Sequence, residues 1–264
     1  MPLVPISREA HAATRVSPLR SFAFAATTTI VPLFGGEILQ FAQELPVVFV
    51  PDSEGFSVAG LLGIRSGENL LVSEQGQWMA ATIPNLWKRG PFRLAYVEGE
   101  AEEKMVLCLD DSSDLLNRAE GQPLFDENGE PAPLVGGASN LLSQLERDMR
   151  ITRKICSDLK RLGLIVPWGF EFPQPDGSTS RASDIYQVDE TKIGTLAAED
   201  LVALRDSGAL PLIYAHLLSL GRISLLLKLA KMAADRRQQR EAVNRSNLNL
   251  DKAFGIVEDD PFIF

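Results

Sequence analysis

The chain has 264 residues, and its content of 45% hydrophobic and 23% charged residues is ordinary for a globular protein, which argues against disorder along its whole length. The net charge of −9 would repel a nucleic-acid backbone, so we expect no nucleic-acid partner. Two cysteines, Cys108 and Cys156, stand outside any metal-binding spacing, and we expect both to be free thiols of a cytoplasmic protein.

The first 20 residues carry three prolines and scattered polar side chains, which predict an irregular arm. The stretch from Ser21 to Phe34 is the most membrane-like of the chain, but it is too short to span a bilayer, which needs about 20 apolar residues. Three consecutive threonines and Pro32 interrupt it, and no small-residue cleavage site follows. We therefore expect a strand over 21–33, and neither an export signal nor a transmembrane segment.

The next part of the chain alternates short apolar segments with turns. The spacing of its apolar residues predicts a short helix over 36–45, which Pro46 ends. Segments rich in β-branched and aromatic residues predict strands at 47–50, 56–64, 69–72, 92–97 and 105–109. The tract 110–137 is rich in Asp, Glu, Gly and Pro and predicts surface loops, with a tight turn at Asn128-Gly129.

The second half of the chain is dominated by helical periodicity. Apolar residues at near-helical spacing predict a long helix from Ser139 to Leu162, with Gly163 as its C-terminal cap. Strands at 164–172 and 184–188 follow, then helices at 195–206 and 210–244. This segregation predicts an α+β fold, in which a β-rich portion (1–137) with an antiparallel or mixed sheet packs with a helix-rich portion (138–264) as one integrated domain.

Short motifs occur in a fixed order along nearly the whole chain. They include Ser21-Phe22-Ala23-Phe24-Ala25, Leu45-Pro46-Val47-Val48-Phe49, Gly76-Gln77-Trp78, Lys88-Arg89-Gly90-Pro91-Phe92 and Ile213-Tyr214-Ala215-His216. The ordered set resembles the SapC family, named for a surface-layer-associated bacterial protein. Ile83 stands where the family has Tyr, which argues against a role for a hydroxyl there. The resemblance implies a bacterial protein, and it leaves the chemistry open because the activity of the family is unsettled.

No catalytic set is complete in the sequence. Nucleophile-elbow, phosphate-loop and dinucleotide-binding motifs are absent, so we expect no cofactor, name no catalytic residue, and lean away from an enzyme. The only histidines are His11 and His216, which with Glu37 form a weak candidate for a metal site. The alternatives are a buried helix histidine for His216 and an N-terminal tether for His11. Ser219 is expected to bond the carbonyl one helical turn earlier.

Aromatic and cationic side chains give the most site-like cluster. Trp78, Trp87, Arg89 and Phe92 combine a large contact area with a guanidinium that can clamp a carboxylate, and Tyr214 is a further candidate for binding. The alternative is that the tryptophans anchor the core and Arg89 is an exposed cation.

The C-terminal part of the chain is basic and then acidic. The helix from Arg222 to Arg245 is basic with an apolar side, which is typical of a packed helix with a solvated face or of a partner-binding helix. The tail from Asp251 to Phe264 combines acidic and aromatic residues, and it suits docking onto its own domain or into another protein.

Together these patterns predict a non-enzymatic accessory or recognition protein that binds another protein or a peptide. Two alternatives stay open: a metal-dependent enzyme that uses His11, His216 and a carboxylate, and a cell-envelope or surface-layer role that rests on the resemblance alone. A homo-oligomer is also open.

Overall fold

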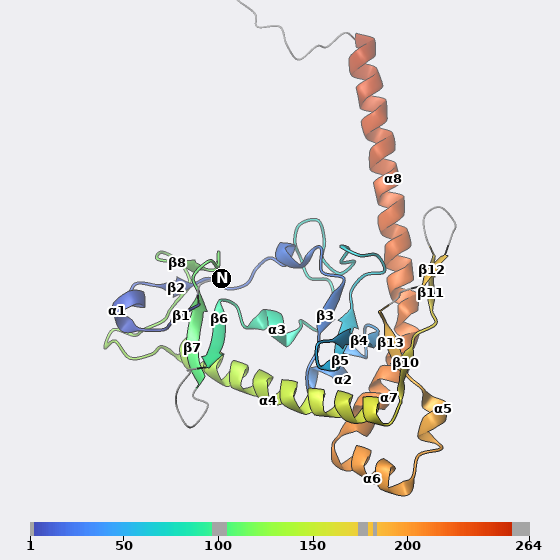
Figure 1. The fold of residues 1–264 in the computed structure, drawn as a ribbon. Coiled ribbons are helices and arrows are strands. Elements are labelled where there is room, and N and C mark those ends of the chain that lie inside the picture. Colours follow the sequence, from blue (N-terminus) through green and yellow to red (C-terminus); the bar gives the residue numbers. More distant parts are fainter. Residues whose placement is uncertain (1–2, 97–104, 174–178, 182–183, 255–264) are drawn as a thin grey trace, which may run out of the picture.

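The structure, a computed structural model, describes residues 3–96, 105–173, 179–181 and 184–254. Strands lie mostly in the first half of the chain and helices in the second, so the predicted α+β fold is confirmed. Two separate hydrophobic clusters organise the molecule, and we call the parts around them the larger lobe and the smaller lobe. Helix α4 (Pro133–Arg161) runs along both lobes (Figure 1).

The larger lobe is built on a five-stranded antiparallel sheet. Across the sheet the strands are β10 (Ile165–Pro167), β13 (Tyr186–Val188), β4 (Val47–Asp52), β5 (Gly55–Leu61) and β3 (Ile30–Pro32). In β4 the consecutive residues Val47, Val48 and Phe49 are all fully buried. Because successive side chains of a strand point to opposite faces, the sheet is covered on both sides here.

The smaller lobe combines two small sheets. One has the order β1 (Leu3–Pro5), β7 (Met105–Asp110), β6 (Phe92–Tyr96), and the other has the order β8 (Leu116–Asn117), β2 (Arg15–Val16), β9 (Gln122–Pro123). Its core joins Val16, Phe92, Leu109 and Leu124 to the first turns of α4. The short helix α1 (Arg8–His11) connects β1 to β2.

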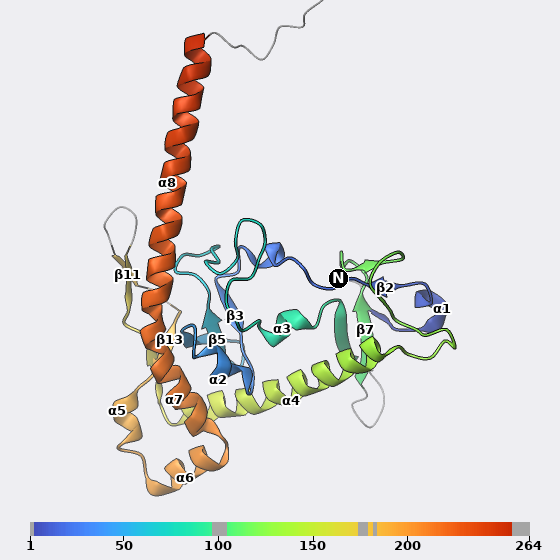
Figure 2. The ribbon, with the colours of Figure 1, turned by 180° about the vertical axis from the view of Figure 1, so that it is seen from behind.

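Shorter elements and the C-terminal helices complete the fold. Before α4 come η1 (Ala23–Ala25), α2 (Glu37–Phe41) and α3 (Asn85–Lys88), and after it the hairpin β11 (Glu171–Pro173) and β12 (Thr179–Arg181). The C-terminal helices are α5 (Glu190–Ile193), α6 (Ala198–Asp206), α7 (Ala209–Ser219), η2 (Leu220–Arg222) and α8 (Ile223–Phe254). Helix α8 starts on the larger lobe and extends well beyond it (Figures 1 and 2).

One helical stretch, Ala209–Val243, is long and apolar enough to cross a membrane by length and composition, and 33% of its most apolar window is buried. A buried helix of a water-soluble protein meets the same criteria, so the stretch alone is weak evidence for a span. The expectation of no transmembrane segment stays a prediction. It was based on Ser21 to Phe34, whereas the more apolar stretch lies near the other end of the chain.

Several local expectations are confirmed. The strands expected at 47–50 and 56–64 are present as β4 and β5, which pair with Val47 opposite Gly60 and Asp52 opposite Gly55. Gly163 ends α4 with a φ of +64°, and the Leu164 amide donates to the Leu159 carbonyl over 3.0 Å, as a glycine cap requires.

Other local expectations are wrong. The N-terminal arm forms β1 and β2 because strands from residues 105–123 supply hydrogen-bond partners that the local sequence does not reveal. The strand expected over 21–33 is reduced to β3, because Asn69 binds the Ala25 carbonyl and holds a turn there. Residues 69–72 form only an isolated bridge, between Val72 and Trp78. The division at 137/138 into two portions of one integrated domain stays a prediction, and α4 spans it.

Candidate functional site

His216 is a fully buried residue of α7 whose two ring nitrogens are both engaged. Its Nδ1 lies 2.7 Å from the Val47 carbonyl oxygen, and its Nε2 lies 3.0 Å from the Val188 amide nitrogen. A carbonyl can only accept and an amide N–H can only donate, so the imidazole is neutral, with its proton on Nδ1. Burial lowers the pKa of His216 to about 4. The ring therefore fastens α7 to β4 and β13.

Ser219 supports the same contact one turn later. Its hydroxyl donates to the His216 carbonyl over 2.7 Å, which confirms the expected bond to the preceding turn, and it accepts from the Val47 amide over 2.9 Å. Both side chains are fully buried. With these bonds made inside the core, the pair has no open position for a substrate.

The candidate metal ligands do not come together. His11 lies in α1 of the smaller lobe, at the opposite end of the molecule from α7 (Figures 1 and 2). Glu37 accepts hydrogen bonds from the Phe34 amide over 2.9 Å and the Asn85 amide over 2.6 Å, and burial raises its pKa. Within the described ranges, no group of three or more His, Cys, Asp or Glu side chains is placed to hold a metal ion.

Both cysteines are free and buried. Burial raises the pKa of Cys108, and burial together with the charge of Asp52 raises the pKa of Cys156 to about 12. A thiol whose pKa is raised by burial stays protonated at neutral pH, whereas the thiolate is the reactive form. The structure gives neither residue the environment of a nucleophile.

The two tryptophans named as binding candidates do meet. The rings of Trp78 and Trp87 lie 5.2 Å apart, edge to face, and Phe22 lies 5.9 Å from Trp78. Phe24 packs 5.8 Å from Trp87 and stays 59% exposed. We call Phe22, Phe24, Trp78 and Trp87 the aromatic cluster. The cluster is half-buried, so one side of it packs against the core and the other side is open to contact from solvent.

Carboxylates in and just after α2 fix the segment 78–88, which carries the two tryptophans of the aromatic cluster. Glu44 accepts from the Ala81 amide over 2.8 Å and from the Thr82 hydroxyl over 2.6 Å. Trp78 Nε1 donates to the Thr82 carbonyl over 3.0 Å, and Glu37 holds the amide of Asn85 at the start of α3. These bonds leave the loop 78–88 little freedom, and the tryptophans are therefore preorganised.

The remaining candidates lie elsewhere. Arg89 follows α3 and is half-buried; burial and the neighbouring charge of Arg93 lower its pKa, while Asp110 opposes this. Phe92 is 3% exposed and packs in the core of the smaller lobe. Tyr214 is half exposed on α7. Of the five candidates, the structure joins only Trp78 and Trp87 by ring contact.

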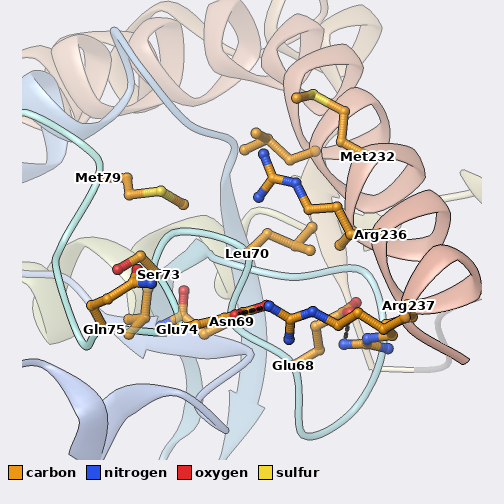
Figure 3. A pocket seen from close by; sticks show the side chains of 14 residues that line it. Glu68, Asn69, Leu70, Ser73, Glu74, Gln75, Met79, Met232, Arg236 and Arg237 are labelled. Atoms are coloured by element: carbon orange, nitrogen blue, oxygen red, sulfur yellow. Dashed lines mark hydrogen bonds and ion pairs between the residues drawn. The ribbon is translucent and has the colours of Figure 1, made fainter. Parts of the chain in front are cut away.

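A groove next to the aromatic cluster was not anticipated. A cavity of about 620 Å³ separates the loop 68–79 from α8, and Met79, which follows Trp78, lines it. Figure 3 shows Met79 from the loop and Arg236 from α8 pointing into this space. Arg237 reaches Glu68, with 3.0 Å between Nη2 and Oε1, and Arg240 pairs with Glu74. We call this cavity the arginine groove.

Arg236 differs from its two arginine neighbours. Among the residues that the structure describes, it has no hydrogen-bond or ion-pair partner, although it lines the groove with the half-exposed Met232. The basic character of this helix was visible in the sequence. Its opposing wall was not, because Glu68 and Glu74 lie more than 160 residues before the arginines that they pair with.

Comparison with known proteins gives a family but no annotated relative. The SapC family model matches residues 6–226, so the sheet, the aromatic cluster and α7 lie within the match, while the α8 wall of the arginine groove lies beyond it. No curated protein matches the chain, and no solved structure does. The match covers most of the chain, and the chain therefore belongs to the SapC family.

Proposed function

We propose that this SapC family member is a non-enzymatic recognition protein that binds a segment of another protein in the arginine groove. The observation that supports this most directly is Arg236, a guanidinium without a partner among the described residues, beside the exposed side chains of Met79 and Met232. A free guanidinium favours a carboxylate, and methionines adapt to apolar side chains of varied shape. The partner segment would then carry both acidic and apolar residues.

The aromatic cluster adds a rigid anchor beside the groove. Trp78 directly precedes Met79 in the chain and contacts Trp87, which contacts the exposed ring of Phe24, so the cluster begins one residue from the groove wall. Tryptophan and arginine dominate the energetics of protein interfaces when they are well packed. The contacts that fix the loop 78–88 reduce the entropy that binding would otherwise cost.

The earlier alternatives receive less support. His11, His216 and Glu37 are held in separate hydrogen-bond networks, so no metal-dependent mechanism follows from them. A cell-envelope role rests on the family name alone, and a cytoplasmic location remains our proposal. Fractionation of cells that produce the protein would distinguish these two locations.

The proposed function is tested with a panel of fluorescent peptides that combine acidic and apolar residues, each paired with a peptide whose acids are replaced by amides. We expect the acidic members to bind, and Arg236→Glu to weaken binding at least about tenfold, or about 1.4 kcal/mol. Arg118→Glu is the matched control, because this exposed arginine of the smaller lobe lies outside the groove. Equal losses in both variants, or no preference for acidic peptides, would contradict the proposal.

A further inference from the structure

A second groove lies on another side of the molecule, where α2, α7 and the start of α8 meet. It encloses about 930 Å³, and its lining includes Leu39, Leu218 and Leu225. These leucines are 43%, 80% and 40% exposed. We call this cavity the apolar groove. Exposed leucines gathered in a concave surface, rather than scattered singly, are typical of a binding site.

The charge of the apolar groove is positive. Arg222 and Lys228 line it, no acidic side chain does, and neither cation has a hydrogen-bond or ion-pair partner in the part of the chain that the structure describes. This contrasts with the arginine groove, where Glu68 and Glu74 already pair with two of the arginines. In a chain of net charge −9, the apolar groove is an unneutralised positive recess. A complementary ligand would offer apolar side chains next to carboxylates.

One segment of this chain has that composition. Glu258, Asp259 and Asp260 are followed after one proline by Phe262, Ile263 and Phe264. The three acids match the cations of the apolar groove in sign, and the three apolar residues match its leucines. This segment lies outside the described residues, so the structure does not show where it binds.

The length of helix α8 determines whether the segment can reach the apolar groove of its own chain. Leu225 lies 29 residues before Phe254, the last residue of α8, which places the end of the helix about 43 Å along its axis at 1.5 Å per residue. Phe262 lies eight residues further, a span of at most about 28 Å when fully extended. With α8 intact, the segment cannot return to the apolar groove of the same molecule.

We infer that the segment Glu258–Phe264 of one copy binds in the apolar groove of a second copy. Its phenylalanines pack against Leu218 and Leu225, and its carboxylates face Arg222 and Lys228. Two copies that exchange their segments reciprocally form a closed, twofold pair, the commonest symmetry of homo-oligomers. The inference is independent of the proposed function, because it uses a different groove.

The test is the mass of the full chain by sedimentation equilibrium. We expect dimers of the 28.9 kDa chain, at least about tenfold weaker association for Leu225→Glu, and the same loss for the double variant Phe262→Ala, Phe264→Ala. Leu201→Glu is the matched control, because Leu201 on α6 is 41% exposed and outside the groove. Thermal unfolding followed by circular dichroism checks that each variant is folded.

Complementation sharpens the test. A mixture of Leu225→Glu with the double phenylalanine variant retains one intact segment and one intact groove, so it should recover heterodimers that neither variant forms alone. A wild-type chain that stays monomeric at about 100 µM overturns the inference. So does association that needs Leu225 but not the phenylalanines, or binding of lipid vesicles that needs Leu225 alone; either result would assign the groove to another occupant. None of these outcomes involves Arg236, so the proposed function stands or falls separately.

Discussion

The inward and outward faces of α7 use their side chains in opposite ways. Inside, His216 and Ser219 bind the backbone of β4 and β13, and their hydrogen-bonding groups are engaged. Outside, Leu218 is exposed, and Arg222, just beyond the helix, is unpaired within the described chain. His216 and Ser219, whose residue types are common in catalytic sites, are therefore structural on this helix. The binding that we propose uses leucine, methionine and arginine side chains at the surface instead.

Among substitutions that test the difference between the two faces of α7, His216→Ala on the inward face should have the largest effect on stability. It removes a buried ring, leaves the Val188 amide without its partner, and leaves the Val47 carbonyl with only the long 3.5 Å contact from the Ser219 hydroxyl. Each unsatisfied buried group costs about 1–3 kcal/mol, and a cavity adds to this, so we expect a loss of about 3–5 kcal/mol in the free energy of unfolding. Urea denaturation would measure it. Tyr214→Ala, on the exposed side of the same helix, should cost less than about 1 kcal/mol, and similar losses in the two variants would contradict the contrast.

A smaller effect is expected on acidification. The pKa of His216 is about 4 in the folded chain and about 6.5 when unfolded, so the unfolded chain binds the additional proton between these values. Stability should therefore rise with pH in this window and fall as pH decreases. Between pH 6.5 and pH 5 we expect a loss of about 2 kcal/mol from this residue. The difference between wild type and His216→Gln, measured by urea unfolding at both pH values, isolates it from the carboxylates, and equal pH dependence would refute it.

The smallest effect is expected on the side of α8 that lines the arginine groove. Arg237 is 62% exposed while the side chain of its partner Glu68 is 10% exposed, so solvent screens the pair through the arginine, and we expect a contribution of about 1 kcal/mol or less. A double-mutant cycle of Arg237→Ala and Glu68→Ala should give a coupling free energy below about 1 kcal/mol that decreases with added salt. A coupling above about 2 kcal/mol would show that this surface is as structural as the interior of α7.

Local sequence patterns predicted the elements that neighbouring residues determine. The hairpin of β4 and β5 and the glycine cap of α4 depend on apolar runs, turn residues and one positive φ. Contacts between distant segments were not predictable in the same way. Strand β13 pairs with β4 across more than a hundred residues, and the partners of His216 are backbone groups, which look alike at every position.

The candidate site was predictable to a similar extent. The proximity of Trp78 and Trp87 in the sequence suggested that they lie together, and their rings are in contact, since only a short segment separates them. The grooves were not foreseen, because each is formed by segments far apart in the chain. Arg236 could not be distinguished from Arg237 and Arg240 without their partners on the loop 68–79.

Helix α4 has a consequence for how this fold tolerates insertions and deletions. Ala138 and Leu142 face the core of the smaller lobe, while Ile155 and Leu159 face that of the larger lobe, all on one continuous helix. One residue inserted between these two groups would rotate one lobe by about 100° relative to the other and shift it by about 1.5 Å. Inserting or deleting seven residues, about two helical turns, would nearly restore the rotation of one lobe relative to the other about the axis of α4. The number of residues between these two groups therefore sets the orientation of the lobes.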